Sequence, residues 1–244
     1  MKRQSLKVSQ RGKIAPFFAM EMLQAANQLA ATGDDILHLE VGEPGFGAPV
    51  SVINVAKTTL DHTILGYTEA LGMPELRARI SRHYKEYYEV EVPSDRVVTT
   101  FGASGAFLLA FLAAFDVGDK IAVVEPSYPA YRNILTALGL QVVPLRAGPK
   151  QRFQPSVDLL QEVGPINGLI IASPSNPTGT MLSKAELKKL VSWCKNKRVR
   201  LISDEIYHGI NYGNSPVTAA SFDDQVIVIN SFSKFKFILF RILW

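Results

Sequence analysis

Five apolar runs of the 244-residue chain end in short segments whose side chains could do chemistry. These segments are residues 102–105 (GASG), 127–129 (SYP), 174–179 (PSNPTG), 204–207 (DEIY) and 231–234 (SFSK). Together they offer an aromatic ring, an amide, a carboxylate, a phenol and an amine. A lysine can form a Schiff base with an aldehyde, and a carboxylate favours a cation beside it. Small residues at a helix start suit a phosphate, although a plain tight turn is an equally good interpretation of residues 102–105.

Each of these residues taken singly also has an ordinary structural interpretation. Tyr128 could be a core residue, Asn176 part of a turn, Asp204 an ion-pair partner, Tyr207 a packing residue and Lys234 a solvated charge. Only their order along the chain, each directly after an apolar run, favours a common site.

The apolar runs themselves predict the elements that must position these side chains. They are residues 96–101, 120–126, 140–146, 167–173, 199–205 and 225–231, and helical patterns lie between them. Continuous apolar runs indicate strands that are buried on both faces, so we predict an α/β fold with a mostly parallel sheet between two helical layers. In such sheets ligands bind at the carboxyl ends of the strands.

Helices are predicted at residues 17–31, 50–61, 74–88 and 183–196. The last is the clearest, because Ser183 and Glu186 form a capping box. Its apolar stripe consists of Leu187, Leu190, Val191 and Cys194.

Composition excludes several classes of protein. The charged content of 20% and net charge of +4 are ordinary, and the basic residues are scattered, so nucleic acid is not an expected partner. A single cysteine, Cys194, cannot form an internal disulfide, and the basic N-terminus has no apolar segment of a secretory signal. Residues 97–115 carry no charge, but their glycines favour strand, turn and helix over a membrane span. We expect a cytoplasmic protein.

Seven segments resemble the sequence blocks of the class I/II aminotransferases, which are fold-type-I enzymes dependent on pyridoxal phosphate (PLP). They are VGEPGF, YTEALGMPELR, TFGASGA, EPSYPAYRN, SPSNPTGT, SDEIYHGINY and NSFSK, and the resemblance runs from about residue 14 to Lys234. It implies the three-layer large domain of that family, preceded by an N-terminal helical arm. We expect the arm at residues 1–45 and the PLP-binding large domain at residues 46–244.

The resemblance also implies a role for individual residues. Lys234 would be the Schiff-base lysine and proton shuttle, Asp204 would face the pyridinium nitrogen, and Tyr207 and Asn176 would face the ring oxygen. Tyr128 would stack on the ring, while Ala103, Ser104, Ser231 and Ser233 would hold the phosphate. Tyr67 would reach the phosphate of a neighbouring subunit, and Gly42 and Asn176 would lie near the substrate.

The end of the chain departs from the family pattern. The family has a phosphate-binding arginine eight residues after the lysine, where this chain has Ile242. Arg241 stands one residue early and is the candidate that the resemblance offers for this contact with the cofactor phosphate. Leu239 and Leu243 occupy positions where the family has small residues. We therefore expect a chain truncated after the lysine motif that lacks the small C-terminal domain.

By this resemblance the chain is a PLP-dependent aminotransferase that acts on an α-amino acid and a 2-oxo acid, and the family implies a homodimer. Two alternatives remain open from the sequence. One is a non-catalytic fragment with residual PLP binding, and the other is a β-lyase of the same fold. The sequence does not identify the amino acid.

Overall fold

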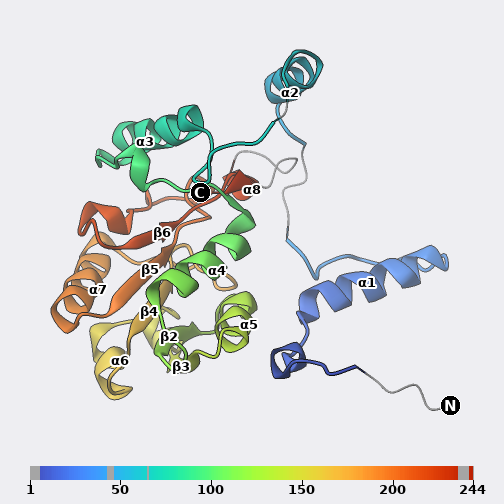
Figure 1. Cartoon of the computed structure of the whole chain (residues 1–244). Coiled ribbons are helices and arrows are strands. Elements are labelled where there is room, and N and C mark those ends of the chain that lie inside the picture. Colours follow the sequence, from blue (N-terminus) through green and yellow to red (C-terminus); the bar gives the residue numbers. More distant parts are fainter. Residues whose placement is uncertain (1–5, 43–46, 65, 236–241, 244) are drawn as a thin grey trace.

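The computed structural model describes residues 6–42, 47–64, 66–235 and 242–243, and its centre is a five-stranded sheet (Figure 1). The strands lie in the order β3-β2-β4-β5-β6, and all neighbours are parallel. Their bounds are β2 Lys120–Glu125, β3 Gln141–Arg146, β4 Gly168–Ala172, β5 Arg200–Asp204 and β6 Ile227–Ile229. Each falls within a predicted apolar run, so the parallel α/β sheet is confirmed.

Helices cover both faces of this sheet because successive side chains of a strand point to opposite sides. In β2, Ile121 and Val123 belong to a core shared with α4 and α5, whereas Ala122 and Val124 belong to a core shared with α6 and α7. The helices are α4 Gly102–Ala114, α5 Pro129–Ala137, α6 Val157–Glu162 and α7 Lys184–Lys197. The predicted three-layer arrangement is thus confirmed.

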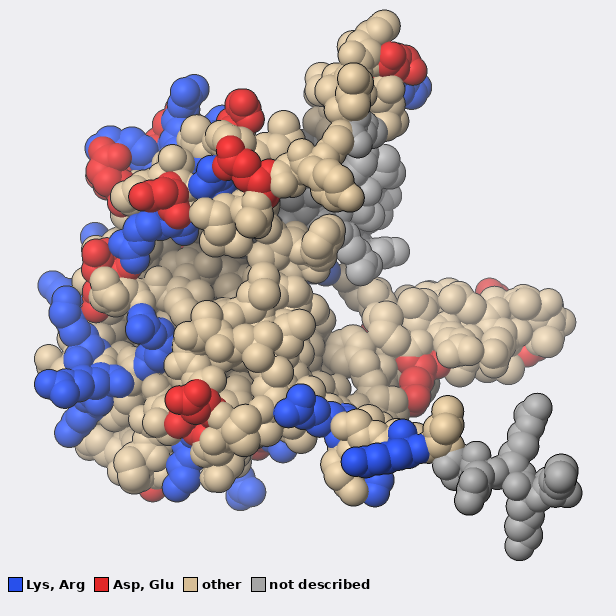
Figure 2. Space-filling model, in the orientation of Figure 1, with Lys and Arg blue, Asp and Glu red and all other residues tan. Residues whose placement is uncertain are grey.

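Helix α7 has the predicted start and the predicted buried face. The Ser183 hydroxyl accepts a hydrogen bond from the Glu186 amide, and the Glu186 carboxylate accepts one from the Ser183 amide at 2.7 Å. The stripe Leu187, Leu190, Val191 and Cys194 is buried. The lysines on the opposite side of α7 are exposed, and Figure 2 shows basic side chains spread over this part of the surface.

The first apolar run forms much less strand than predicted. Only Thr100–Phe101 of this run forms a strand, β1, and it pairs antiparallel with β7, Ile242–Leu243, outside the five-stranded sheet. The preceding Thr99 instead donates its backbone N–H to the Leu71 carbonyl at 3.0 Å. Long-range pairing with a loop thus replaces the regular strand that the apolar run predicted.

Three α-helices precede β1 in the described part of the chain. They are α1 Phe18–Ala31, α2 Val50–His62 and α3 Pro74–Tyr88, as predicted to within one residue. Helix α3 packs Ile80 and Tyr84 into a small core beside β6. Helices α1 and α2 have no buried residue and stand apart from the sheet (Figure 1). None of the helices in the described ranges is long and apolar enough to cross a membrane.

Candidate active site

The carboxyl ends of β5 and β6 bring the predicted acid and the predicted lysine segment to one edge of the sheet. Asp204, the last residue of β5, is paired with Ile229, the last residue of β6. Ser231 follows two residues later, and α8 (Phe232–Phe235) carries the half-buried Lys234. Figure 1 shows α8 at this edge. Parallel pairing therefore places the Asp204 and Lys234 segments side by side.

Asp204 is a buried carboxylate, with 4% of its surface exposed. Its Oδ2 accepts a hydrogen bond from the Tyr131 hydroxyl, and its Oδ1 accepts one from the Ile206 amide at 3.1 Å. Burial raises the pKa of Asp204 to about 6, although both hydrogen bonds oppose the rise. Burial and the neighbouring Asp204 also raise the pKa of Tyr131, which keeps the phenol as a hydrogen-bond donor.

Asn176 and Tyr207 meet at the same edge, although they come from different loops. The Asn176 amide donates a hydrogen bond to the Tyr207 hydroxyl at 3.3 Å. Burial and then Asp204 raise the pKa of Tyr207, while the Asn176 bond opposes the rise. Both side chains thus present neutral donors beside a buried acid.

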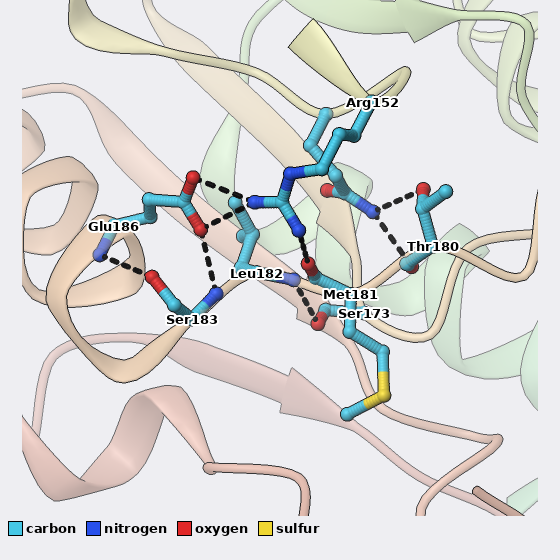
Figure 3. Close-up of polar contacts among 8 residues, drawn as sticks. Arg152, Ser173, Thr180, Met181, Leu182, Ser183 and Glu186 are labelled. Atoms are coloured by element: carbon cyan, nitrogen blue, oxygen red, sulfur yellow. Dashed lines mark hydrogen bonds and ion pairs between the residues drawn. The ribbon is translucent and has the colours of Figure 1, made fainter. Parts of the chain in front are cut away.

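A network of polar contacts holds the loop that carries Asn176 (Figure 3). Arg152 donates hydrogen bonds to both carboxylate oxygens of Glu186, at 2.6 and 2.7 Å, and to the Met181 carbonyl at 3.1 Å. Ser173 accepts a hydrogen bond from the Leu182 amide at 2.9 Å. The Ser173–Leu182 bond therefore joins the two ends of the loop, and Arg152 holds its far end against the start of α7.

Gln154, which is buried, also joins the two sides of this loop. Its amide nitrogen lies 2.8 Å from the Thr180 carbonyl and 3.2 Å from the Ala172 carbonyl. Thr180 in turn accepts a hydrogen bond from the Ser175 amide at 3.0 Å. Gln154 thus connects β4 to the far side of the turn that contains Asn176.

We expect Gln154→Leu to destabilise the chain more than Arg152→Met. Leucine removes the buried hydrogen bonds to the Ala172 and Thr180 carbonyls, each of which contributes about 0.5–1.5 kcal/mol, whereas a half-exposed ion pair contributes about 0–1 kcal/mol. Urea unfolding of the two variants beside the wild type measures the difference. Equal losses of unfolding free energy, or a larger loss for Arg152→Met, would contradict this ranking.

The start of α4 and the segment after β6 supply groups suited to an anion. The first turn of α4 holds Ala103 and Ser104, and its N-cap residue Phe101 makes no side-chain capping bond. Amides at a helix start attract phosphate groups. Past β6, the hydroxyls of Ser231 and Ser233 lie 2.6 Å apart. Helices α4 and α8 both contact β7.

The remaining predicted site residues differ in their surroundings. The ring of Tyr128 packs edge-on against the ring of Tyr131, with 5.5 Å between centroids, and the ring is thereby held near Asp204. Tyr67 is fully exposed, and Gly42 lies on an exposed stretch of the N-terminal segment. Arg241 lies outside the described residues, so its predicted contact with a phosphate stays a prediction.

Comparison with known proteins decides the family. The sequence pattern of the family "Aminotransferase class I and II" matches residues 34–236. This chain belongs to that family. The valine–pyruvate aminotransferase of Mycobacterium tuberculosis is 45% identical over 232 residues, which cover 94% of this chain and 60% of the relative. The aspartate aminotransferase of Thermotoga maritima is 33% identical over 220 residues, which cover 88% of this chain and 58% of the relative.

Solved aminotransferase structures match the fold as closely. A crystal structure of an aminotransferase from Mycobacterium tuberculosis has a TM-score of 0.94 and 44% identity, covering 98% of this chain and 63% of that one. Aspartate aminotransferase from Thermus thermophilus with maleate has a TM-score of 0.93 and 25% identity, covering 98% and 64%. The chain thus spans about three fifths of the length of these aminotransferases.

Class I and II aminotransferases depend on PLP, and the residues at this edge fit that cofactor. Both donors that the structure gives to Asp204, the Tyr131 hydroxyl and the Ile206 amide, are neutral. A cationic ring nitrogen would supply the charge that a buried carboxylate requires. Hydroxyls and helix-start amides suit the phosphate, and the Lys234 amine suits the aldehyde.

Several residues that shape this site were not singled out from the sequence. They are Tyr131, Gln154, Glu205 and His208, all of them buried. A partial signal existed for Tyr131, which follows Tyr128 by three residues and so lies on the same side of a helix. Glu205 and His208 flank Ile206 and Tyr207 in the DEIYH motif, but the hydrogen-bond partners of His208, Tyr88 and Ser173, lie 120 and 35 residues away in the sequence.

Proposed function

We propose that this chain carries the cofactor site of an aminotransferase that moves an amino group between an α-amino acid and a 2-oxo acid. The observation that carries the proposal is the buried Asp204 carboxylate at the edge where α8 begins, in a member of the class I and II family. Relatives named as valine–pyruvate and aspartate aminotransferases support the same reaction class.

When bound, PLP supplies an electron sink for the electron pair that remains at the substrate α-carbon. Asp204 would keep the ring nitrogen protonated, because an ionised carboxylate favours a cation beside it. Asn176 and Tyr207 would donate hydrogen bonds to the ring oxygen. Lys234 would hold the aldehyde and, once released, would move a proton at the substrate α-carbon, a task worth roughly 10²–10⁴ in rate.

The anion-binding groups would fix the other end of the cofactor. Ala103 and Ser104 would hold the phosphate at the start of α4, together with Ser231 and Ser233. The aromatic ring of Tyr128 would cover one face of the pyridine ring.

Further parts of the proposal concern partners and location. Tyr67 is the residue we expect to reach a phosphate in a second copy, which requires a homodimer and agrees with its full exposure. Gly42 would lie near the substrate carboxylate.

We propose a cytoplasmic location, which agrees with the low cysteine content of the sequence. Arg241 would add a positive charge at the phosphate.

A single half-reaction tests this proposal. The chain is loaded with PLP, freed from excess cofactor and mixed with L-valine, L-aspartate or each of the other common amino acids. One equivalent of 2-oxo acid per bound PLP, with no free ammonia, is the expected product. Ammonia release would instead indicate a lyase, and bound PLP with no product from any amino acid would indicate a non-catalytic binding fragment.

A further inference from the structure

His208 is a buried histidine whose two ring nitrogens contact two distant parts of the chain. Its side chain is almost wholly enclosed, and the residue is 5% exposed. Nε2 lies 2.9 Å from the Ser173 carbonyl oxygen, which can only accept, so Nε2 carries a hydrogen and donates it. Nδ1 lies 2.7 Å from the hydroxyl of Tyr88, at the end of α3. One imidazole therefore joins α3, the loop after β4 and the loop after β5.

The two loops that His208 joins are those that carry the proposed ring-oxygen ligands. Tyr207 precedes His208 directly, and Asn176 follows Ser173 by three residues. These two ligands contact each other through a long hydrogen bond of 3.3 Å, from the Asn176 amide to the Tyr207 hydroxyl. The shorter His208 bond behind them is thus the stronger restraint on their separation.

Glu205 restrains the imidazole from a second side. Its Oε1 accepts hydrogen bonds from the Ser203 hydroxyl at 2.9 Å and the Ala219 amide at 2.8 Å. Its Oε2 is buried without a hydrogen-bond partner within the described part of the chain, and it lies 3.6 Å from Nδ1 of His208. The ionisable groups that face His208 are therefore Tyr88 from α3 and Glu205 from its own loop.

Tyr88 is suited to remain a donor in this arrangement. Burial, and then the charge of Glu205, raise the pKa of Tyr88, so the phenol keeps its proton across the working range of the protein. A protonated phenol can donate to Nδ1 while Nε2–H donates to the Ser173 carbonyl. Both nitrogens of the His208 ring then make a hydrogen bond at the same time.

We propose that His208, held by Tyr88 and Glu205, is a positioning residue that sets the separation of Asn176 and Tyr207 and so tunes the ring oxygen of the cofactor. This inference rests on the proposed function, since it concerns the same cofactor. It predicts that loosening His208 moves both loops together without touching PLP directly. Weaker donation to the ring oxygen would then raise the pH at which lysine-bound PLP loses its proton.

The test compares His208→Leu with His208→Gln. Leucine can make neither hydrogen bond, whereas glutamine can donate to Ser173 and accept from Tyr88. In the PLP-free chain we expect amide exchange of residues 173–179 and 204–210 to rise about tenfold in His208→Leu and to stay near wild type in His208→Gln. In the PLP-loaded chain, the pH midpoint of the visible band should rise by about one unit in His208→Leu only.

Wild-type exchange and a wild-type midpoint in His208→Leu would overturn the inference. If His208→Leu does not fold, Tyr88→Phe carries the test, because it frees one side of the imidazole and keeps the bond to Ser173. In Tyr88→Phe we expect a smaller rise in amide exchange and a smaller rise in the pH midpoint of the visible band. Wild-type values of both quantities would overturn the inference. A wild-type chain with no visible band would contradict the proposed function, and the exchange comparison, which needs no PLP, would still decide the role of His208.

Discussion

Asp204→Asn is expected to weaken PLP binding about 10- to 100-fold and, at the same time, to stabilise the PLP-free chain at pH 7.5. A hydrogen bond to a charged group contributes about 1.5–3 kcal/mol, and asparagine loses the charge that attracts a ring cation. Asparagine keeps the local contacts, because its oxygen can accept from the Ile206 amide and its nitrogen can donate to the Tyr131 hydroxyl. PLP affinity should therefore fall while the PLP-free chain keeps its fold.

The stabilisation follows from the direction of the Asp204 pKa. Burial raises this pKa from its ordinary value of 3.8 to about 6, so the folded chain holds the proton more tightly than the unfolded chain. The stability linked to that proton is fully present below pH 3.8 and is lost as the pH rises through 6. The difference of about two pKa units corresponds to about 3 kcal/mol. Asparagine does not titrate, so the Asp204→Asn chain does not lose this stability as the pH rises.

Thermal or urea unfolding of the PLP-free proteins at pH 4 and pH 7.5, with PLP titrations at pH 7.5, measures both effects. Asp204→Asn should be the more stable protein at pH 7.5, by up to about 3 kcal/mol, and the gap should close at pH 4. Asp61→Asn, an exposed acid on α2, is the matched control and should change neither quantity. Unchanged PLP affinity in Asp204→Asn would contradict the role of this carboxylate.

Lys234→Ala should abolish covalent attachment of PLP and slow amino transfer by at least roughly 10²–10⁴-fold. Alanine has no amine to hold the aldehyde and no group to move a proton at the substrate α-carbon. The phosphate and ring contacts that we propose do not involve this amine, so PLP should still bind, though more weakly. Absorbance spectra before and after borohydride, followed by gel filtration, separate covalent from reversible binding.

Lys120→Ala is the control for this experiment. Lys120 begins β2 at the amino end of the strand, on the opposite edge of the sheet, and is exposed. This variant should keep the visible band and the wild-type rate. A Lys234→Ala protein that retains a borohydride-fixed band would show that another lysine carries the cofactor.

The sheet and its helices were predictable because their signals are local. A parallel strand that is buried on both faces is a continuous apolar run, as in residues 120–125 and 200–204. The capping box of Ser183 and Glu186 likewise lies within one helical turn. The β1–β7 pair was not predictable, since two-residue strands leave almost no pattern and pair only through contacts distant in sequence.

The candidate site divides in the same way. The residues at the strand ends, Asp204 and Asn176 among them, could be found because each follows an apolar run. Their supports could not, because they depend on tertiary contacts. Tyr131 and Asp204 are 73 residues apart, and Tyr88 and His208 are 120 residues apart. No spacing rule connects residues at such separations before the fold is known.

The most direct test of the account is to locate the residue that PLP modifies. The wild-type chain is incubated with PLP, reduced with borohydride, digested and mapped by mass spectrometry. We predict one pyridoxyl phosphate group per chain, on the peptide that contains Lys234, with much lower yield in Asp204→Asn. Partial modification of many exposed lysines, such as Lys188 and Lys195, or the absence of a pyridoxyl phosphate group at Lys234, would contradict the central claim.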